Sequence, residues 1–127
     1  MRVAGIGFRG AAELGSLQDA LEAAIAAAGG APVEALVTEA AKARSYVFRE
    51  LAYELGIPGL GVSTQELAGM ITPSQSERIL DKFGTGSLCE AAALAAAGPQ
   101  ARLVAARVVS GDGMATAAIA DIKGNTT

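Results

Sequence analysis

The residues with the clearest chemical potential lie near the start of the chain, where Gly5–Gly10 reads Gly-Ile-Gly-Phe-Arg-Gly. A short apolar run from Val3 precedes this segment, which predicts a β-strand that ends in a glycine-rich loop with one cation, Arg9. Glycines allow a tight turn and let a ligand approach the main chain closely. The segment also matches G-x-G-x-x-G, the dinucleotide-binding fingerprint. The candidate ligand contacts here are Gly7, Phe8, Arg9 and Gly10.

Two further segments offer groups for an anion. The stretch 38–45 follows a second predicted strand and holds Thr38, Lys42 and Arg44. The stretch 84–87 opens a predicted helix, whose first backbone N–H groups can bind an anion; its candidate contacts are Thr85, Gly86 and Ser87. If the three segments meet, the site is cationic on an acidic chain. That combination suits a ligand rich in carboxylates or phosphates.

Strand-like and helix-like segments alternate along the chain, which predicts the elements that position these groups. The expected strands are 3–6, 36–38, 60–62, 103–109 and 114–122, and the expected helices are 16–28, 45–55, 64–68, 75–82 and 88–97. The pattern predicts a three-layer α/β/α sandwich with a mainly parallel sheet of about five strands. A C-terminal hairpin around 110–113 adds one antiparallel strand. Ligands of such folds lie outside the carboxyl ends of the parallel strands, where the strand order reverses.

Serine residues mark three expected helix starts. Ser16 is a candidate N-cap for the first helix. Ser74 with Glu77, and Ser87 with Glu90, have the spacing of capping boxes for the two later helices.

Composition narrows the class of protein. The 127 residues suit a single domain, with 124–127 as a loose tail. A net charge of −3 does not favour nucleic acid, and no stretch reaches the roughly 18 apolar residues of a membrane helix. No signal peptide is evident, so we expect a cytoplasmic protein.

The chain contains no histidine, which removes Ser–His and Cys–His catalytic pairs and the usual zinc sites. We therefore expect neither a metal nor a cofactor. The single cysteine, Cys89, is expected to be a small buried core residue.

Several segments in order resemble the family formed by CobE and the C-terminal domain of CbiG, from cobalamin (vitamin B12) biosynthesis. The resemblance covers roughly residues 3–120, and the single-domain length is most like standalone CobE. It rests on 5–10, the Thr38…Lys42 spacing, 54–58, 63–67, 86–94 and 115–120. The family often has Cys where Phe8 stands and an acidic residue near Arg44; the nearest match to its basic residue in the penultimate strand is Arg107.

The resemblance implies a protein that binds corrin or precorrin intermediates and carries or shields them between pathway enzymes. These macrocycles are edged with acetate and propionate groups, with which Arg9, Lys42 and Arg44 would pair. Phe8 would lie against the ring. Other enzymes of the pathway are the expected protein partners.

Three alternatives remain open from the sequence. The first is the CbiG-like opening of a cobalt-precorrin-5A lactone with loss of acetaldehyde, for which Glu39, Glu90 and Asp112 are the available carboxylates. The second is dinucleotide binding, which requires a helix that opens at Gly10. The third is a protein-interaction module without a ligand.

Overall fold

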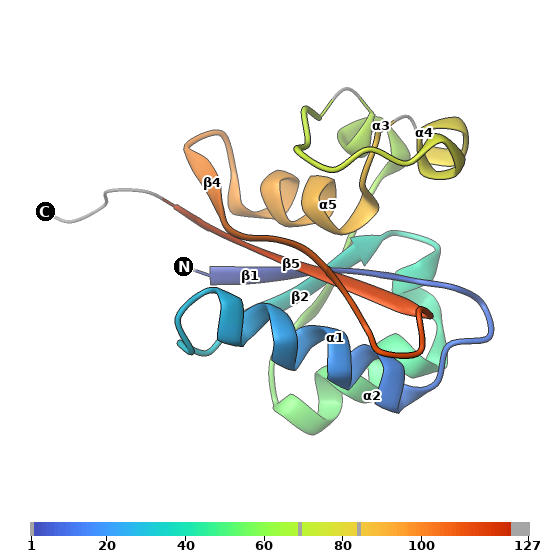
Figure 1. Cartoon of the computed structure of the whole chain (residues 1–127), viewed down its shortest axis with the longest axis vertical. Coiled ribbons are helices and arrows are strands. Elements are labelled where there is room, and N and C mark those ends of the chain that lie inside the picture. The colour runs from blue at the N-terminus through green and yellow to red at the C-terminus, as the bar shows by residue number, and fades with distance from the viewer. Residues whose placement is uncertain (1, 69, 84, 123–127) are drawn as a thin grey trace, which may run out of the picture.

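The computed structural model describes residues 2–68, 70–83 and 85–122, which form one five-stranded sheet between two layers of helices (Figure 1). The strands are β1 (Arg2–Phe8), β2 (Ala35–Glu39), β3 (Gly59–Val62), β4 (Ala101–Val109) and β5 (Ala115–Ile122). Their order across the sheet is β3-β2-β1-β5-β4. β1, β2 and β3 are parallel, whereas β5 runs antiparallel to both of its neighbours, β1 and β4. The predicted fold class is therefore confirmed.

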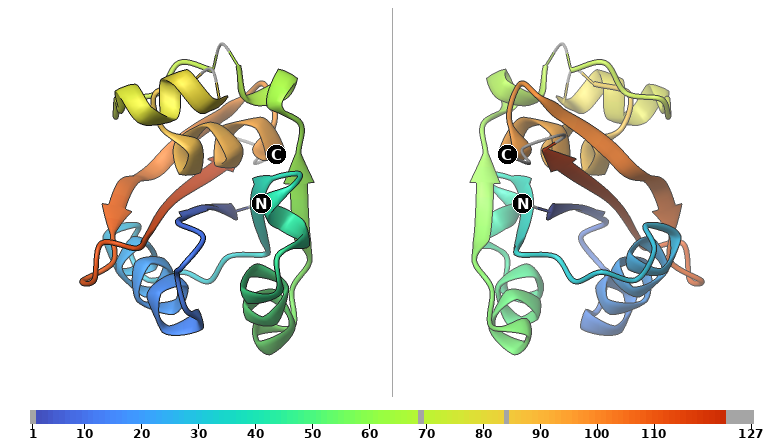
Figure 2. Two further views of the ribbon diagram at one scale, coloured as in Figure 1. Left: turned by 90° about the vertical axis from the view of Figure 1, so that its right-hand side faces the viewer. Right: turned by 90° about the vertical axis from the view of Figure 1, so that its left-hand side faces the viewer.

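Helices cover both faces of the sheet (Figures 1 and 2). The helical elements are α1 (Leu14–Ala27), the 3₁₀ turn η1 (Lys42–Arg44), α2 (Tyr46–Leu55), α3 (Thr64–Leu67), α4 (Glu77–Phe83) and α5 (Leu88–Ala97). α1 and α2 lie on one face, and α5 lies on the other, with α3 and α4 beyond it. Within the described ranges, no helix has the length and apolar character needed to cross a membrane. The predicted tail at 124–127 lies outside the described residues.

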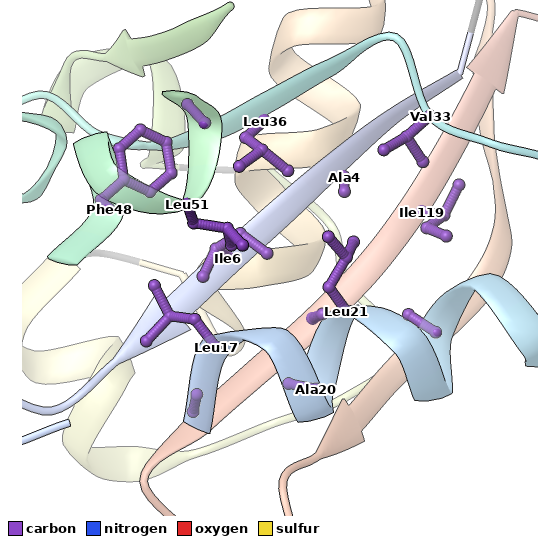
Figure 3. Close-up of a cluster of buried hydrophobic side chains, with 14 of the residues drawn as sticks. Ala4, Ile6, Leu17, Ala20, Leu21, Val33, Leu36, Phe48, Leu51 and Ile119 are labelled. Carbon is purple, nitrogen blue, oxygen red and sulfur yellow. The ribbon is translucent and has the colours of Figure 1, made fainter. Parts of the chain in front are cut away.

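The core on the α1–α2 face is built from aliphatic side chains and one aromatic ring (Figure 3). Ile6 and Leu36 of the sheet face Leu17 of α1 and Phe48 of α2, and all four are fully buried. The buried residues of this cluster recur three or four positions apart in the helices and two positions apart in β1, which are the periods of helical and extended chain. This side of the molecule is an ordinary helix-on-sheet core.

The opposite face depends on very small side chains. A Cβ atom on Gly5 would lie 1.9 Å from the carbonyl oxygen of Cys89, so α5 approaches β1 more closely than any other residue would permit. Ala91, Ala92 and Ala93 of α5 are fully buried against the sheet or against α3 and α4. Close-packed interiors leave no room for an added methyl group at such a contact. The alanines of α5 therefore allow this helix to pack closely against the sheet.

The first helix begins earlier than predicted. α1 starts at Leu14 with Glu13 as N-cap, and the Ser16 hydroxyl accepts a hydrogen bond from the Glu13 backbone N–H at 3.4 Å. Ser16 also donates to the carboxylate of Asp112 in the β4–β5 turn. The prediction that Ser16 is the N-cap was wrong, because this serine sits in the first turn and ties it to the hairpin.

Of the two serines predicted to form capping boxes, Ser87 caps its helix and Ser74 does not. The Ser87 hydroxyl caps α5 by accepting a hydrogen bond from the Glu90 backbone N–H at 3.5 Å. The Glu90 carboxylate does not form the second bond of a capping box, to the Ser87 backbone N–H. It instead accepts from the backbone N–H and hydroxyl of Ser74, at 2.9 and 3.0 Å. Because Ser74 is engaged by Glu90, it does not cap α4, which starts at Glu77. The hydroxyl of Ser76 accepts from the Ile79 N–H there, at 3.4 Å.

Candidate functional site

A cavity of about 380 Å³ lies where β1 ends and β5 begins, beneath α4 and beside the start of α5. In Figure 1 these ends of β1 and β5 lie on the same side of the molecule as α4. A second hollow of about 360 Å³ adjoins it, and the two share Phe8, Gly10, Lys42, Lys82 and Phe83. The position agrees with the rule that ligands lie at the carboxyl ends of parallel strands.

The charged side chains among the described residues that line the larger cavity are all positive. Five of the chain's ten Lys and Arg residues line it: Arg9, Lys42, Arg78, Lys82 and Arg107. Among the described residues that line it, none carries a carboxylate. The chain as a whole has a net charge of −3, so this concentration of cations is local. Such a surface attracts anions through both Coulomb attraction and hydrogen-bond donation.

The cations come from both sides of the cavity. Arg9 follows β1, Lys42 lies in η1 and Arg107 lies near the end of β4. Arg78 and Lys82 are four residues apart on α4, which places them on the same side of that helix. A ligand in the cavity would therefore meet positive charge from the sheet edge and from α4.

Lys42 is the most constrained of these cations. Its Nζ donates to the carbonyl oxygen of Phe8 at 2.7 Å and lies 4.8 Å from the centroid of the Phe8 ring. Burial lowers the pKa of the Lys42 ammonium, the charges of Lys82 and Arg78 lower it further, and the carboxylate of Glu39 opposes them. Burial is the largest cause of this lowering, and the part that comes from Lys82 and Arg78 shows that these cations lie close enough to Lys42 to repel it.

Aromatic and aliphatic groups complete the walls. The Phe8 ring is stacked on the buried Phe48 ring, with centroids 6.4 Å apart and planes 11° apart, which fixes its orientation. Phe83 and Ile79 of α4, together with Met114, add further apolar surface. Flat rings beside cations suit a ligand with a planar apolar body and a charged edge.

Glu90 holds two parts of this wall in place. It is fully buried, and its oxygens accept from Ser74 as described above and from the backbone N–H of Arg107 at 2.8 Å. Arg107 lies in a stretch where the register between β4 and β5 shifts, and such irregularities redirect side chains. One buried carboxylate on α5 thus fastens both the start of α4 and the stretch of β4 that carries Arg107.

Seven of the ten predicted site residues line the cavity together: Gly7, Phe8, Arg9, Gly10, Lys42, Gly86 and Ser87. The other three do not line either hollow. Arg44 is exposed, and Thr85 is buried and donates to the Met70 carbonyl oxygen at 3.3 Å. Thr38 is fully buried, and its hydroxyl has no hydrogen-bond partner in the part of the chain that the structure describes.

The sequence did not predict eleven of the lining residues. Four lie on α4, namely Arg78, Ile79, Lys82 and Phe83, and the others are Ser76, Leu88, Arg107, Gly113, Met114, Ala115 and Thr116. α4 carries a cationic pair and an apolar pair, each spaced by four residues, but this spacing is also typical of a helix with one solvated face. Arg107 was noted only as the nearest match to a basic family position. Its place at the cavity depends on the irregular pairing of β4, which has no clear sequence signature.

The glycines of the fingerprint serve packing rather than a phosphate turn. Gly5 admits α5, and a Cβ on Gly7 would lie 2.7 Å from the Thr116 hydroxyl oxygen. Gly10 faces open space, and α1 begins four residues later, at Leu14. A dinucleotide site needs the helix to open at the third glycine. This requirement is not met, and β5 runs antiparallel beside β1.

Comparison with known proteins places these features in context. The family model described as cobalamin synthesis G C-terminus matches residues 2–120. The crystal structure of CobE, a protein from the cobalamin (vitamin B12) biosynthetic pathway, is 29% identical, with a TM-score of 0.83, over 94% of this chain and 89% of that one. Cobalamin biosynthesis protein chiG from Agrobacterium tumefaciens str. C58 is 37% identical, with a TM-score of 0.75, over 98% and 100%.

A more distant structure shares the fold alone. It is described as a cobalamin biosynthesis protein G homolog from Sulfolobus solfataricus, and it is 16% identical with a TM-score of 0.67. The match covers 98% of this chain but 37% of that one, so the fold also occurs within a longer protein. No curated protein matches the chain.

Proposed function

The chain belongs to the cobalamin synthesis G C-terminus family, and from that premise we propose that it binds corrin or precorrin intermediates of cobalamin biosynthesis in the cationic cavity. The observation that carries the proposal is the set of five Lys and Arg side chains around an aromatic-walled cavity whose described lining has no carboxylate. Corrin precursors have the matching shape: a flat macrocycle with acetate and propionate groups around its edge.

The two hollows suit a ligand larger than either one. Phe8, Lys42 and Lys82 border both of them, so a macrocycle that spans the pair would lie across these side chains. Its ring would pack against Phe8 and Phe83, and its peripheral carboxylates would reach the surrounding cations. Arginine pairs with a carboxylate through two parallel hydrogen bonds, which orients the ligand as well as holding it.

A carrier or shielding role fits the site better than catalysis. Glu90 is buried with its oxygens engaged by Ser74 and Arg107, and Asp112 is engaged by Ser16, Ser110 and the Met114 N–H. Burial raises the pKa of the Cys89 thiol, which disfavours the thiolate. The chain has no histidine, and the described residues that line the larger cavity include no carboxylate, so the two commonest kinds of general base are missing from that lining. We therefore propose that the ligand is passed unchanged to other pathway enzymes.

The test is a titration with hydrogenobyrinic acid, a metal-free corrin with free carboxylates, followed by visible absorption and calorimetry. We expect one-to-one binding that weakens with salt. Arg9→Ala should weaken it by about tenfold or more, since a charge-assisted hydrogen bond contributes about 1.5–3 kcal/mol. Arg44→Ala is the matched control, because Arg44 is also exposed but does not line the cavity. No binding by the folded protein would overturn the proposal.

Lactone hydrolysis is the second candidate, and one residue favours it. Glu39 lines the adjoining hollow, and its Oε1 accepts from the Lys42 backbone N–H at 3.2 Å, which leaves its other oxygen available to act as a base. Incubation of the pure protein with cobalt-precorrin-5A, with detection of acetaldehyde, tests this directly. Turnover that Glu39→Gln abolishes would establish hydrolysis in place of a pure carrier.

A further inference from the structure

We infer that the cavity selects the free polycarboxylate form of its macrocycle and rejects forms whose peripheral carboxylates have become neutral amides. This inference rests on the proposed function and specifies the chemical state of the ligand. It also implies that a reaction that neutralises those carboxylates acts after this protein and releases the ligand from it.

The first support is the kind of group that lines the cavity. Lys and Arg side chains donate hydrogen bonds and cannot accept them. A carboxylate offers two accepting oxygens to such donors, whereas a primary amide offers one oxygen and turns an NH₂ group toward the other donor. With Arg9, Arg78 and Arg107 presenting guanidinium groups, each amide in place of a carboxylate loses a paired contact and brings two donors together.

The second support is the arrangement of the charges. Lys42 lies close enough to Lys82 and Arg78 for both to lower its pKa, so these cations repel one another when no anion is present. Among the described residues, the carboxylate that opposes their effect on Lys42 is that of Glu39, beside the adjoining hollow. An anionic ligand relieves this repulsion, but a neutral ligand would leave it in place while displacing water from the same charges.

The third support is that the cations come from separate elements around the cavity. Arg9 follows β1, Lys42 lies in η1 and Arg107 lies in β4, so these three form the wall at the end of the sheet. The other two cations form the wall on α4. Several carboxylates at once, at separate points of the ligand edge, are needed to satisfy both walls. A macrocycle with carboxylates all round its periphery meets that requirement, whereas progressive amidation removes partners from one wall or the other.

The experiment compares three corrins with the same ring system: hydrogenobyrinic acid, a derivative with two carboxylates converted to amides, and the fully amidated derivative. Affinity should fall along the series, by about tenfold or more for each neutralised carboxylate that faces a cation. The salt dependence should be steep for the free acid and nearly flat for the full amide. Equal affinity for all three would overturn the inference while leaving corrin binding intact, whereas no binding of any would remove the proposed function itself.

A double variant of α4 tests the same inference from the side of the protein. Arg78→Gln with Lys82→Gln removes two exposed cations from α4 without touching the core. We expect this variant to lose affinity for the free acid but not for the full amide, so the ratio between the two ligands narrows. The same ratio in Arg44→Gln should equal that of the unaltered protein, because Arg44 lies outside the cavity. An unchanged ratio in the α4 variant would contradict the inference.

Discussion

Glu90 offers the sharpest test of how the site is built. It lies in the first turn of α5, and it is fully buried while it accepts three hydrogen bonds, from the Ser74 N–H, the Ser74 hydroxyl and the Arg107 N–H. Glu90→Gln keeps the size of the side chain but leaves one accepting oxygen in place of two. The substituted NH₂ group must then face a backbone donor.

The expected cost follows from these contacts. At least one buried N–H, that of Ser74 or that of Arg107, loses its acceptor, and an unsatisfied buried donor costs about 1–3 kcal/mol. The remaining bonds also lose the strength that the carboxylate charge gave them. We expect Glu90→Gln to lower the free energy of unfolding by about 3 kcal/mol, equivalent to about 10 °C in Tm for a chain of this size.

The chain contains a matched control. Glu66 accepts from the backbone N–H and hydroxyl of Ser63, at 3.0 and 3.1 Å, which is the same pair of bonds that Glu90 forms with Ser74. Glu66 is exposed, so water can replace what Glu66→Gln removes. That variant should lose less than about 1 kcal/mol, the usual worth of an exposed capping contact.

Denaturation by urea, monitored by far-UV circular dichroism, measures both variants. A binding titration with hydrogenobyrinic acid provides a second readout, because Glu90 fastens the segments that carry Arg78 and Arg107. Glu90→Gln should weaken binding under conditions where it is still folded, and Glu66→Gln should not. If the two variants lose equal stability, the buried carboxylate does not have the role assigned to it here.

Three further predictions test other parts of the molecule. Gly5→Ala should prevent stable folding or cost more than about 3 kcal/mol, because its Cβ would collide with the Cys89 carbonyl, whereas Gly10→Ala should be tolerated; expression and thermal unfolding of the pair decide this. Thr38→Val should raise stability by about 1 kcal/mol in urea denaturation, because it removes a buried hydroxyl without a partner among the described residues, and it should leave corrin affinity unchanged if Thr38 is no ligand contact. Bound carboxylates favour the charged form of Lys42. Ligand affinity should therefore be highest at pH values below the lowered pKa of Lys42 in the free protein, and it should decrease as the pH rises through that pKa. In Lys42→Arg, whose side chain stays charged, calorimetric titrations should show no such decrease.

The layered fold followed from the sequence because its signals are local. Apolar periodicity and the turn at 110–113 locate the strands and helices without knowledge of what they touch. The glycine-rich segment and Lys42 meet at one edge because they follow parallel strands, whose carboxyl ends lie together, whereas Gly86 and Ser87 reach that edge because α5 packs directly on β1. The errors arose where long-range contacts override local chemistry. Ser74 has the spacing of a cap with Glu77 but is bound to Glu90, sixteen residues away.

The contribution of α4 could not be read from pattern alone for a related reason. Its cations have the spacing of an ordinary solvated helix face, and nothing local shows that this face turns toward a cavity. Thr38 is the reverse case, because it was predicted as a site residue but does not line either hollow. It follows the rule for residues near the end of a parallel strand, but its side chain is fully buried, because β2 is covered on both faces along Ala35–Thr38.

The glycine-rich segment at Gly5–Gly10 shows that one sequence pattern can arise from two physical causes. In a dinucleotide site, the glycines make room for a pyrophosphate. In this chain, Gly5 makes room for the backbone of α5, and the close approach brings the Ser87 cap and the Glu90 carboxylate to the edge of the sheet. The same strand then continues to Phe8, and Arg9 follows it; both residues line the cavity. Since a larger residue at Gly5 would move α5 away from β1, the glycine affects the ligand site through the helix that it admits, without any contact with the ligand itself.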